Sequence, residues 1–318
     1  MKKILCIGEA LIDMICTDRN KSLTDGVNFL KKAGGAPMNV AAAIAALGGD
    51  VMVAAKVGAD PFGQHLIDVL KSFQVDTTHI IRDAKYFTTF AFVSLMENGE
   101  RDFYFNRGAD GMLSKEDVAD IDLKACSIVH FGSATGFLPG PLQETYTDLL
   151  DKSKSAGRII SFDPNYRQLL FGHQQEAFIS RSWSFIKACD FFKVSDEEAL
   201  LITGKTSVEA AAEEFFNQSS AVFAITLGRE GTMLGIDNTV TIIPSIPINA
   251  VDTTGAGDAF VGAVLYQLSA LENMRIGELQ QSDWQEIIHK ANKAGARTCE
   301  YLGAMEAFKN LSRDIFKS

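Results

Sequence analysis

The chain alternates short, almost wholly apolar runs with longer stretches in which apolar residues recur at helical spacing. Short apolar runs of this kind are typical of parallel strands that are buried on both faces of a sheet. They lie at 3–8, 50–57, 127–131, 158–162, 191–194 and 221–226, and the predicted helices lie near 37–47, 63–73, 142–156, 174–187 and 283–301. The repeated strand and helix order predicts an α/β fold with a doubly wound, mostly parallel sheet flanked by helices.

A second pattern, in which apolar and polar residues alternate, appears at 88–95 and 101–106. These segments flank Asn98-Gly99, which is a strong signal for a hairpin turn. Residues 12–16 and 27–31 can add strands, so we expect a small antiparallel sheet attached to the main fold. Its alternating aromatic residues predict one apolar face, made by Phe90, Phe92, Phe103 and Phe105. That face would either pair two copies of the chain in a homodimer or cover a ligand within one copy.

Composition narrows the class of protein. The chain has 318 residues, 47% of them hydrophobic, without internal repeats or linker-like runs, and is predicted to form a single domain over residues 1–318. Its net charge of −10 argues against a nucleic-acid or anionic-membrane surface and favours small-molecule partners. Five cysteines without a C-x-x-C pair indicate reduced thiols in a cytoplasmic protein. The spacing of the histidines is not that of a structural zinc site.

The turn at 252–258, Asp-Thr-Thr-Gly-Ala-Gly-Asp, precedes an apolar stretch with helical spacing. A helix N-terminus favours negative charge, and small residues let backbone N–H groups converge on one anion. These small residues are Gly255, Ala256 and Gly257. Asp258 is either a helix-stabilising carboxylate or a catalytic base beside a bound phosphate. Because Phe260 stands where a dinucleotide fingerprint has its third glycine, the turn predicts a phosphate site of another kind.

A second glycine-rich loop, at 34–39, leads into an alanine-rich helix. Gly34 and Gly35 permit close backbone approach to a polar ligand, and Asn39 can both donate and accept hydrogen bonds. Asp13 follows the first strand, and ligands gather at the carboxyl ends of parallel strands. The alternative for the loop at 34–39 is a compact loop with an Asn near the helix cap, and the alternative for Asp13 is a turn or surface residue.

Polar clusters also follow later strands, at 163–167, 195–198 and 226–231. Each cluster alone is consistent with a capped turn. Their repeated placement at strand ends favours a ligand site along one edge of the predicted sheet.

Two segments resemble the signatures of the ribokinase-like (PfkB) carbohydrate kinases: GGAPMNVAAAIAALGG at 34–49 and DTTGAGDAFVGAVL at 252–265. The likeness covers essentially the whole chain, and within the family 90–106 and 162–167 are most similar to fructokinases. The resemblance implies a ribokinase-like fold in which the small sheet, formed by about 11–33 and 86–107, is a lid over a sugar. It also implies an ATP-dependent kinase that uses Mg²⁺ and, in many members, a monovalent cation such as K⁺.

The resemblance assigns roles to residues that match family positions. Asp258 matches the catalytic base, and Gly255, Ala256 and Gly257 match an anion hole for the transferring phosphoryl group. Positions that contact the sugar are matched by Asp13, Gly34, Gly35 and Asn39, and positions close to sugar or phosphate by Arg107 and Arg167. Nucleotide-binding segments contain Lys193, Thr226, Gly228, Gly231 and Asn292. Glu198 matches a residue that organises Mg²⁺ through water, and the monovalent-cation loops contain Asp252, Thr254 and Gly303.

One position departs from the family pattern. The family often has Asn-x-x-Glu after the strand that contains Lys193, whereas here Ser195 replaces the Asn and Glu198 keeps the Glu. The replacement puts one contact around Mg²⁺ in doubt.

The residues and the resemblance together predict phosphoryl transfer from ATP to fructose, with Asp258 removing a hydroxyl proton. We expect the helix N-terminus to keep Asp258 ionised and weakly basic, so that proton removal accompanies a late, loose transition state. One alternative is a kinase for another sugar or a sugar acid such as 2-keto-3-deoxygluconate, whose carboxylate would suit Arg107 or Arg167. A second alternative is a catalytically silent, sugar-binding regulatory relative.

Overall fold

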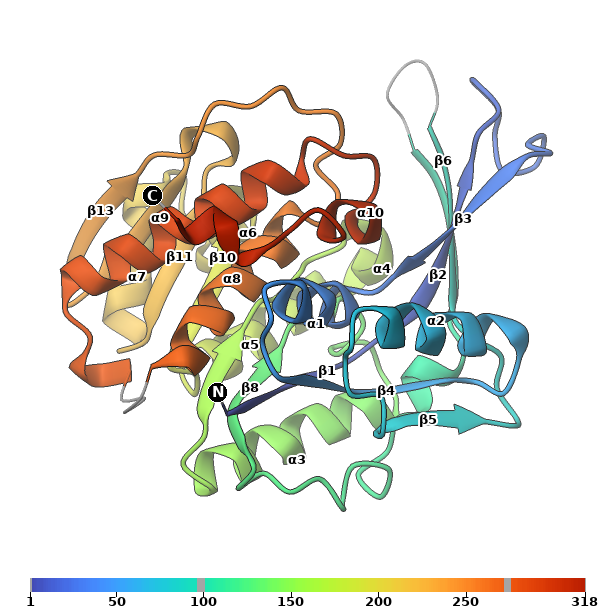
Figure 1. Cartoon of the computed structure of the whole chain (residues 1–318), viewed down its shortest axis with the longest axis horizontal. Helices are drawn as coiled ribbons and strands as arrows, with labels where there is room; N and C mark the ends of the chain where they lie inside the picture. The colour runs from blue at the N-terminus through green and yellow to red at the C-terminus, as the bar shows by residue number, and fades with distance from the viewer. Residues whose placement is uncertain (1, 96–100, 272–275, 318) are drawn as a thin grey trace.

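The computed structural model describes residues 2–95, 101–271 and 276–317. Its centre is a nine-stranded sheet (Figure 1). In spatial order the strands are β13 (Thr239–Ile243), β12 (Thr232–Ile236), β11 (Val222–Thr226), β10 (Phe191–Ser195), β9 (Ile159–Phe162), β8 (Cys126–Phe131), β1 (Lys3–Ile7), β4 (Val51–Gly58) and β5 (Ile80–Asp83). The pairings from β11 to β5 are parallel, and β12 and β13 add an antiparallel edge. The predicted mostly parallel sheet is confirmed.

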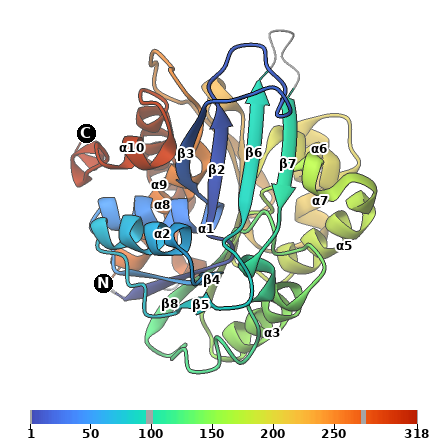
Figure 2. The same cartoon turned by 90° about the vertical axis from the view of Figure 1, so that its right-hand side faces the viewer.

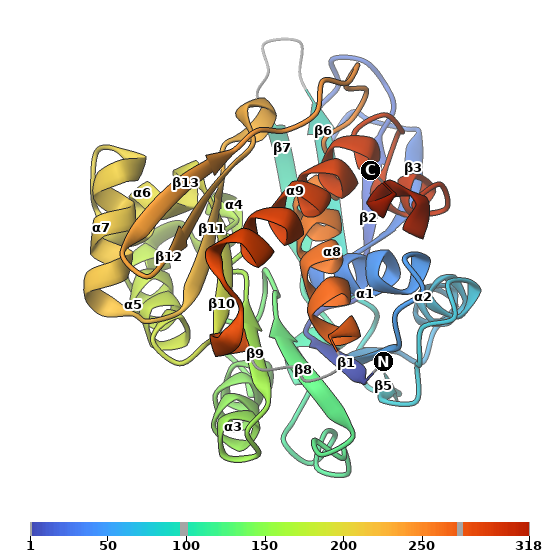
Figure 3. The ribbon, with the colours of Figure 1, turned by 60° about the vertical axis from the view of Figure 1, so that its left-hand side comes forward.

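Helices pack on both faces of this sheet, and the apolar strands show why. In β1, Ile4 and Cys6 join one core cluster, whereas Leu5 and Ile7 join another on the opposite face. The first cluster packs α1 (Ala36–Ala46), α2 (Pro61–Ser72), α8 (Ala256–Ala270) and α9 (Gln281–Thr298). The second packs α3 (Pro141–Ser155), α5 (Gln175–Ile186), α6 (Asp196–Thr203) and α7 (Val208–Gln218). Figure 3 shows α8 and α9 in front of the sheet.

Some short helices differ from the prediction. The segment at 195–198, expected to be a polar turn, starts α6, and α7 follows it. Two further short helices that were not predicted are α4 (Gln168–Phe171) and α10 (Ala304–Phe308), which follows the helix predicted at 283–301. In the described ranges, no helix combines the length and the apolar character needed to cross a bilayer.

A separate four-stranded sheet, the small sheet, stands on the larger one (Figure 2). Its order is β3 (Phe29–Gly34), β2 (Leu11–Cys16), β6 (Phe90–Leu95) and β7 (Arg101–Asn106). Its two hairpin pairings are antiparallel as expected, but β2 and β6 pair in parallel because both strands leave the main fold in the same direction. The Asn98-Gly99 turn lies outside the described residues.

The aromatic residues of the small sheet lie on both of its faces. Phe92 pairs with Tyr104 and Ala91 pairs with Phe105, so Phe90 and Phe92 share one face while Phe103 and Phe105 share the other. On the first face, the ring of Phe90 packs 4.8 Å from that of Phe62 in α2. The predicted single apolar face is therefore wrong, because the register of the hairpin separates the two aromatic pairs. The homodimer stays a prediction without this support.

The chain crosses between the two sheets at 8–10, 34–36, 87–89 and 107–109. These crossings lie where the carboxyl end of β1 meets the base of the small sheet. The crossing at 34–36 belongs to the first of the two signature segments.

All five cysteines are buried and free. Four of them belong to the main fold, whereas Cys16 ends β2 in the small sheet.

Candidate active site

The turn that precedes α8 has the conformation that its glycines allow. Gly255 is in the left-handed region with φ of 82°, and a Cβ there would lie 2.5 Å from the Cβ of Ala304. A larger residue would therefore be strained and would also clash. Helix α8 starts at Ala256, which places Gly257 and Asp258 in its first turn, as predicted.

Asp258 is joined to the other glycine-rich loop by a long-range contact. Asn39 Nδ2 donates a hydrogen bond to Asp258 Oδ2 at 2.8 Å, and the two residues are 219 positions apart in the chain. The buried Asn39 Oδ1 has no hydrogen-bond partner among the described residues. That oxygen is available to accept a hydrogen bond from a ligand hydroxyl.

Burial, with a smaller contribution from the nearby Asp163, raises the pKa of Asp258 to about 6, against the lowering effects of Asn39, Arg167 and Lys193. We expected the helix N-terminus to keep Asp258 weakly basic, but the raised pKa shows a stronger base. Desolvation outweighs the effect of the helix N-terminus and leaves a carboxylate that is ionised at neutral pH but more basic than an exposed aspartate.

Asp13 lies against the second glycine-rich loop, at 34–39. A Cβ on Gly34 would come within 2.1 Å of Asp13 Oδ2, so only glycine leaves room for this carboxylate. Burial raises the pKa of Asp13 to about 6, and Arg167 acts to lower it. Gly35 has φ of 108°, and a Cβ there would lie 2.4 Å from the carbonyl oxygen of Glu9. The second loop therefore needs both of its glycines.

Lys193 lies beside the turn that starts α8. Its Nζ is 3.2 Å from Asp163 Oδ2 and 3.2 Å from the position that a Cβ on Gly257 would occupy. Burial lowers the pKa of Lys193, but Asp163, Glu198 and Asp258 together raise it above its usual value. A buried, positively charged ammonium thus faces the predicted anion site.

Ser195 and Glu198 form the start of α6. Ser195 Oγ accepts a hydrogen bond from the Glu198 backbone N–H at 3.1 Å, and Glu198 Oε2 accepts one from the Ser195 N–H at 2.8 Å. Glu198 Oε1 also accepts a hydrogen bond from the Tyr166 N–H at 2.7 Å. Ser195 therefore acts as a helix cap and orients Glu198, which gives this departure from the family pattern a structural reason.

We expect Ser195→Ala to lower the free energy of unfolding by about 1 kcal/mol, because it removes the cap of α6. Urea unfolding followed by circular dichroism measures this change. Ser207→Ala, which removes the cap of α7 through its bond to the Ala210 N–H, is the matched control. If the cap is the only function of Ser195, both variants change stability alone; a loss of activity confined to Ser195→Ala would contradict this.

The predicted nucleotide segment at 226–231 lies at the carboxyl end of β11. Gly228 has φ of 56° with open space around it, whereas a Cβ on Gly231 would lie 2.1 Å from the Ile243 carbonyl oxygen. Thr226 Oγ1 donates to the Val194 carbonyl at 3.3 Å. Asn292 is buried and holds the main chain, since its Nδ2 donates to the Ile243 carbonyl at 2.9 Å. Its Oδ1 accepts from Thr232 Oγ1 at 2.6 Å, which leaves the nucleotide contact of Asn292 a prediction.

The two segments predicted to bind a monovalent cation are tied together. Asp252 Oδ2 accepts a hydrogen bond from the Gly303 N–H at 2.8 Å, and its Oδ1 accepts from the Thr254 N–H at 2.9 Å. These bonds, together with a nearby lysine, Lys32 of β3, lower the pKa of Asp252 despite its partial burial. The turn before α8 is thus held by Gly303, the residue that precedes α10.

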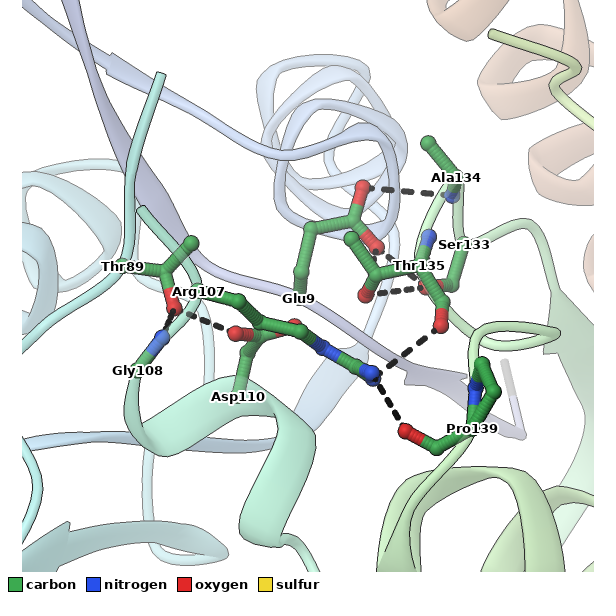
Figure 4. Close-up of polar contacts among 9 residues, drawn as sticks. All are labelled: Glu9, Thr89, Arg107, Gly108, Asp110, Ser133, Ala134, Thr135 and Pro139. Atoms are coloured by element: carbon green, nitrogen blue, oxygen red, sulfur yellow. Dashed lines mark hydrogen bonds and ion pairs between the residues drawn. The ribbon is translucent and has the colours of Figure 1, made fainter. Parts of the chain in front are cut away.

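The two arginines differ in how they are held. Arg107 Nη1 donates to the Pro139 carbonyl at 2.7 Å and Nη2 donates to the Thr135 carbonyl at 3.3 Å (Figure 4). Arg167 is exposed, and its guanidinium donates at 3.1 Å to the carbonyl of its neighbour Tyr166. Arg167 is near enough to Asp13 and Asp258 to lower the pKa of both.

Glu9 was not predicted to take part, although it is buried beside the site. Its exposed fraction is 1%, and Oε1 accepts a hydrogen bond from the Ala36 N–H at 3.0 Å. The sequence feature that could have identified Glu9 is a carboxylate directly after a strand predicted to be buried.

Comparison with known proteins identifies close similarity over the whole chain. The model of the pfkB family carbohydrate kinases matches residues 1–310. The chain is 34% identical over 307 residues to "Probable fructokinase-2" of Arabidopsis thaliana, which covers 96% of this chain and 92% of the relative.

Solved structures show the same likeness. A fructokinase from Xylella fastidiosa with bound ATP superposes with a TM-score of 0.87 at 28% identity, covering 99% of this chain and 97% of the other. A fructokinase from Vibrio cholerae O395 in a form that binds fructose, ADP and calcium ion superposes with a TM-score of 0.85 at 28% identity, covering 100% and 98%. A double mutant of that enzyme with fructose, ADP and potassium ion has a TM-score of 0.82 at 27% identity, covering 100% and 97%.

Proposed function

Because the chain belongs to the pfkB family of carbohydrate kinases, we propose that it transfers the γ-phosphoryl group of ATP to fructose and forms fructose 6-phosphate. The observation that carries this proposal is the contact between Asn39 and Asp258, which joins the sugar loop to the phosphoryl-transfer turn. The similarity to plant fructokinases supports fructose as the sugar. The five free thiols are consistent with a cytoplasmic enzyme.

In this mechanism the sugar lies between Asp13 and Asp258. Asp13, the Gly34–Gly35 backbone and Asn39 Oδ1 hydrogen-bond its hydroxyls. Asp258 takes the proton of the attacking sugar hydroxyl. At the same time the hydroxyl oxygen bonds to the γ-phosphorus, and the bond between the γ-phosphorus and the β–γ bridging oxygen of ATP breaks. A pKa of about 6 suits a base that acts at neutral pH.

The transferring phosphoryl group lies at the start of α8. The backbone N–H groups of Gly255, Ala256 and Gly257 and the ammonium of Lys193 stabilise the charge on its oxygens. The nucleotide extends along the turn that contains Thr226, Gly228 and Gly231, with Asn292 behind it.

The carboxylates near Lys193 fit Mg²⁺ held through water, since each oxygen of Glu198 accepts a backbone N–H and keeps a further lone pair. The ion would neutralise charge on the phosphates of ATP. A monovalent cation such as K⁺ would bind between the two hydrogen-bonded segments that contain Asp252, Thr254 and Gly303, and would support the anion hole there.

The small sheet acts as a lid in this proposal, through residues 11–33 and 86–107. Its inner face carries Asp13 toward the sugar. Ile15 and Leu30, paired on the same face, are 39% and 41% exposed and would be covered when the sheet closes over a ligand.

A sugar-acid substrate is less well supported. Such a substrate needs a free guanidinium for its carboxylate, but Arg107 already contacts two backbone carbonyls and Asp110. Of the two arginines predicted to lie near the substrate, Arg167 alone remains to bind such a carboxylate. A silent regulatory relative would not need the Asp258 and anion-hole arrangement described above.

A coupled assay of ATP turnover with fructose, glucose, ribose and 2-keto-3-deoxygluconate tests the proposal. We expect the largest kcat/KM for fructose. A larger kcat/KM for the acid would reassign the substrate, and sugar binding without turnover of any of the four would favour the regulatory alternative.

A further inference from the structure

The four crossings between the two sheets are joined by buried side chains in one hydrogen-bonded chain. We call it the crossing network and define it as Glu9, Thr89, Arg107, Asp110 and Thr135 (Figure 4). All of its members except Arg107 are at most 1% exposed. The network contains residues of the crossings at 8–10, 87–89 and 107–109 and bonds to the fourth, at 34–36.

Glu9 joins the first two crossings. Its Oε1 accepts hydrogen bonds from the Ala36 N–H at 3.0 Å and from the Ala134 N–H at 3.3 Å. Its Oε2 accepts from the hydroxyls of Ser133 and Thr135. Four donors thus surround a buried carboxylate, and one of them is the first residue of α1, which carries Asn39.

Asp110 joins the other two crossings. Its Oδ1 accepts a hydrogen bond from the Thr89 hydroxyl, which itself accepts one from the Gly108 N–H at 2.8 Å. The Thr89 carbonyl accepts from the Ile12 N–H at 3.0 Å, so this half of the network also holds β2, which carries Asp13.

Thr135 and Arg107 connect the two halves. Thr135 donates its hydroxyl to Glu9 at 3.5 Å and offers its carbonyl to Arg107 Nη2 at 3.3 Å, while Arg107 Nε lies 3.5 Å from Asp110 Oδ2. Gly111 leaves room for this arginine, since a Cβ there would lie 2.8 Å from Arg107 Nε. The guanidinium is held by the protein on three sides.

We infer that Glu9 and Arg107 are positioning residues that act as a pair, fixing the base of the small sheet relative to the sugar loop so that Asp13 and Asn39 meet one ligand together. Arg107 then acts through the crossing network and not through a direct contact with substrate. Removing either residue frees both halves, because the chain of bonds between them is interrupted.

The test compares Glu9→Ala, Glu9→Gln, Arg107→Met and the double variant Glu9→Ala/Arg107→Met. The first readout is hydrogen exchange of the backbone amides at 34–39 and 107–113 in the protein without ligands. We expect Arg107→Met to speed exchange at 34–39, and Glu9→Ala to speed exchange at 107–113, although each substitution lies outside the segment whose exchange it changes. Glu9→Gln should restore the wild-type rates, because its amide oxygen can accept from Ala36 and Ala134 while Ser133 and Thr135 reverse their hydroxyls.

The second readout is kinetic and rests on the proposed function. Glu9→Ala and Arg107→Met should each raise the KM for fructose roughly tenfold to a hundredfold with a much smaller change in kcat, and the double variant should match the worse single variant. If the wild-type protein does not phosphorylate fructose, the proposed function fails while the exchange result still tests the network.

Arg158→Met is the matched control. Arg158 also donates to two backbone carbonyls, those of Ala156 at 2.9 Å and Cys126 at 2.8 Å, at the opposite end of the sheet. It should lower stability without changing the KM for fructose or exchange at 34–39. Wild-type exchange at 34–39 in Arg107→Met, or fully multiplicative effects in the double variant, would overturn the inference.

Discussion

Asp258→Asn should lower kcat by roughly 10²–10⁴-fold, since the substitution removes the proposed base and keeps the size of the side chain and the hydrogen bond to Asn39. It is one of the two largest effects we expect. Steady-state ATP turnover with saturating fructose measures it. Turnover within a few-fold of wild type would exclude Asp258 as the base.

Asp283→Asn separates this role from helix capping. Asp283 occupies the same third position of α9 that Asp258 occupies in α8, and it caps its helix through the Gln280 N–H at 2.9 Å. Asp283→Asn should lose about 0.5–1 kcal/mol of stability at most and keep wild-type kcat.

The pKa of Asp258, about 6, sets the expected pH dependence. The base must be ionised, so kcat should fall as the pH drops below about 6. The stability effect has the opposite sign: because the folded-state pKa lies above the usual 3.8, the folded protein binds the proton more tightly, and Asp258 lowers the free energy of unfolding as the pH rises from about 4 to 6. Asp258→Asn should therefore be at least as stable as wild type at pH 7.5, which thermal unfolding can check.

Lys193→Met should lower kcat by roughly 10²–10³-fold, because it removes the positive charge beside Gly257 where the phosphoryl oxygens would lie. It should also cost about 3–5 kcal/mol of stability by leaving the buried Asp163 unpaired. Urea unfolding and ATP turnover measure the two effects separately.

The double variant Lys193→Met/Asp163→Asn should recover much of the lost stability without recovering kcat. Lys56→Met is a matched control, since Lys56 pairs with Asp117 at 2.8 Å and Asp83 at 3.5 Å away from the site. It should lose stability and keep kcat. Recovery of turnover in the double variant would mean that Lys193 serves only to balance Asp163.

The main sheet could be predicted from the sequence because its strands are apolar on both faces. Local patterns such as the turn at 252–258 also determine their own conformation, so the position of Asp258 in the first turn of α8 was predictable. The start of α6 was not, because Ser195, Glu197 and Glu198 read equally well as a polar turn and as a capped helix.

Features that depend on pairing between distant segments could not be predicted. The faces of Phe90 and Phe105 follow from the hairpin register, which is set by strand pairing and not by composition. The burial of Glu9 depends on donors near 134, and the place of Lys193 depends on the approach of α8. The raised pKa of Asp258 likewise comes from neighbours far away in the chain.

The positions of the buried cysteines allow local and global unfolding to be measured by thiol alkylation. Burial raises the pKa of Cys6 and of Cys126, to about 11 for the latter, and both lie in adjacent central strands. These thiols can be alkylated only when the central sheet opens. Cys16 lies instead at the end of β2, so its alkylation reports fluctuations of the small sheet alone. Pulse labelling read by mass spectrometry can thus distinguish local from global opening in the unmodified protein.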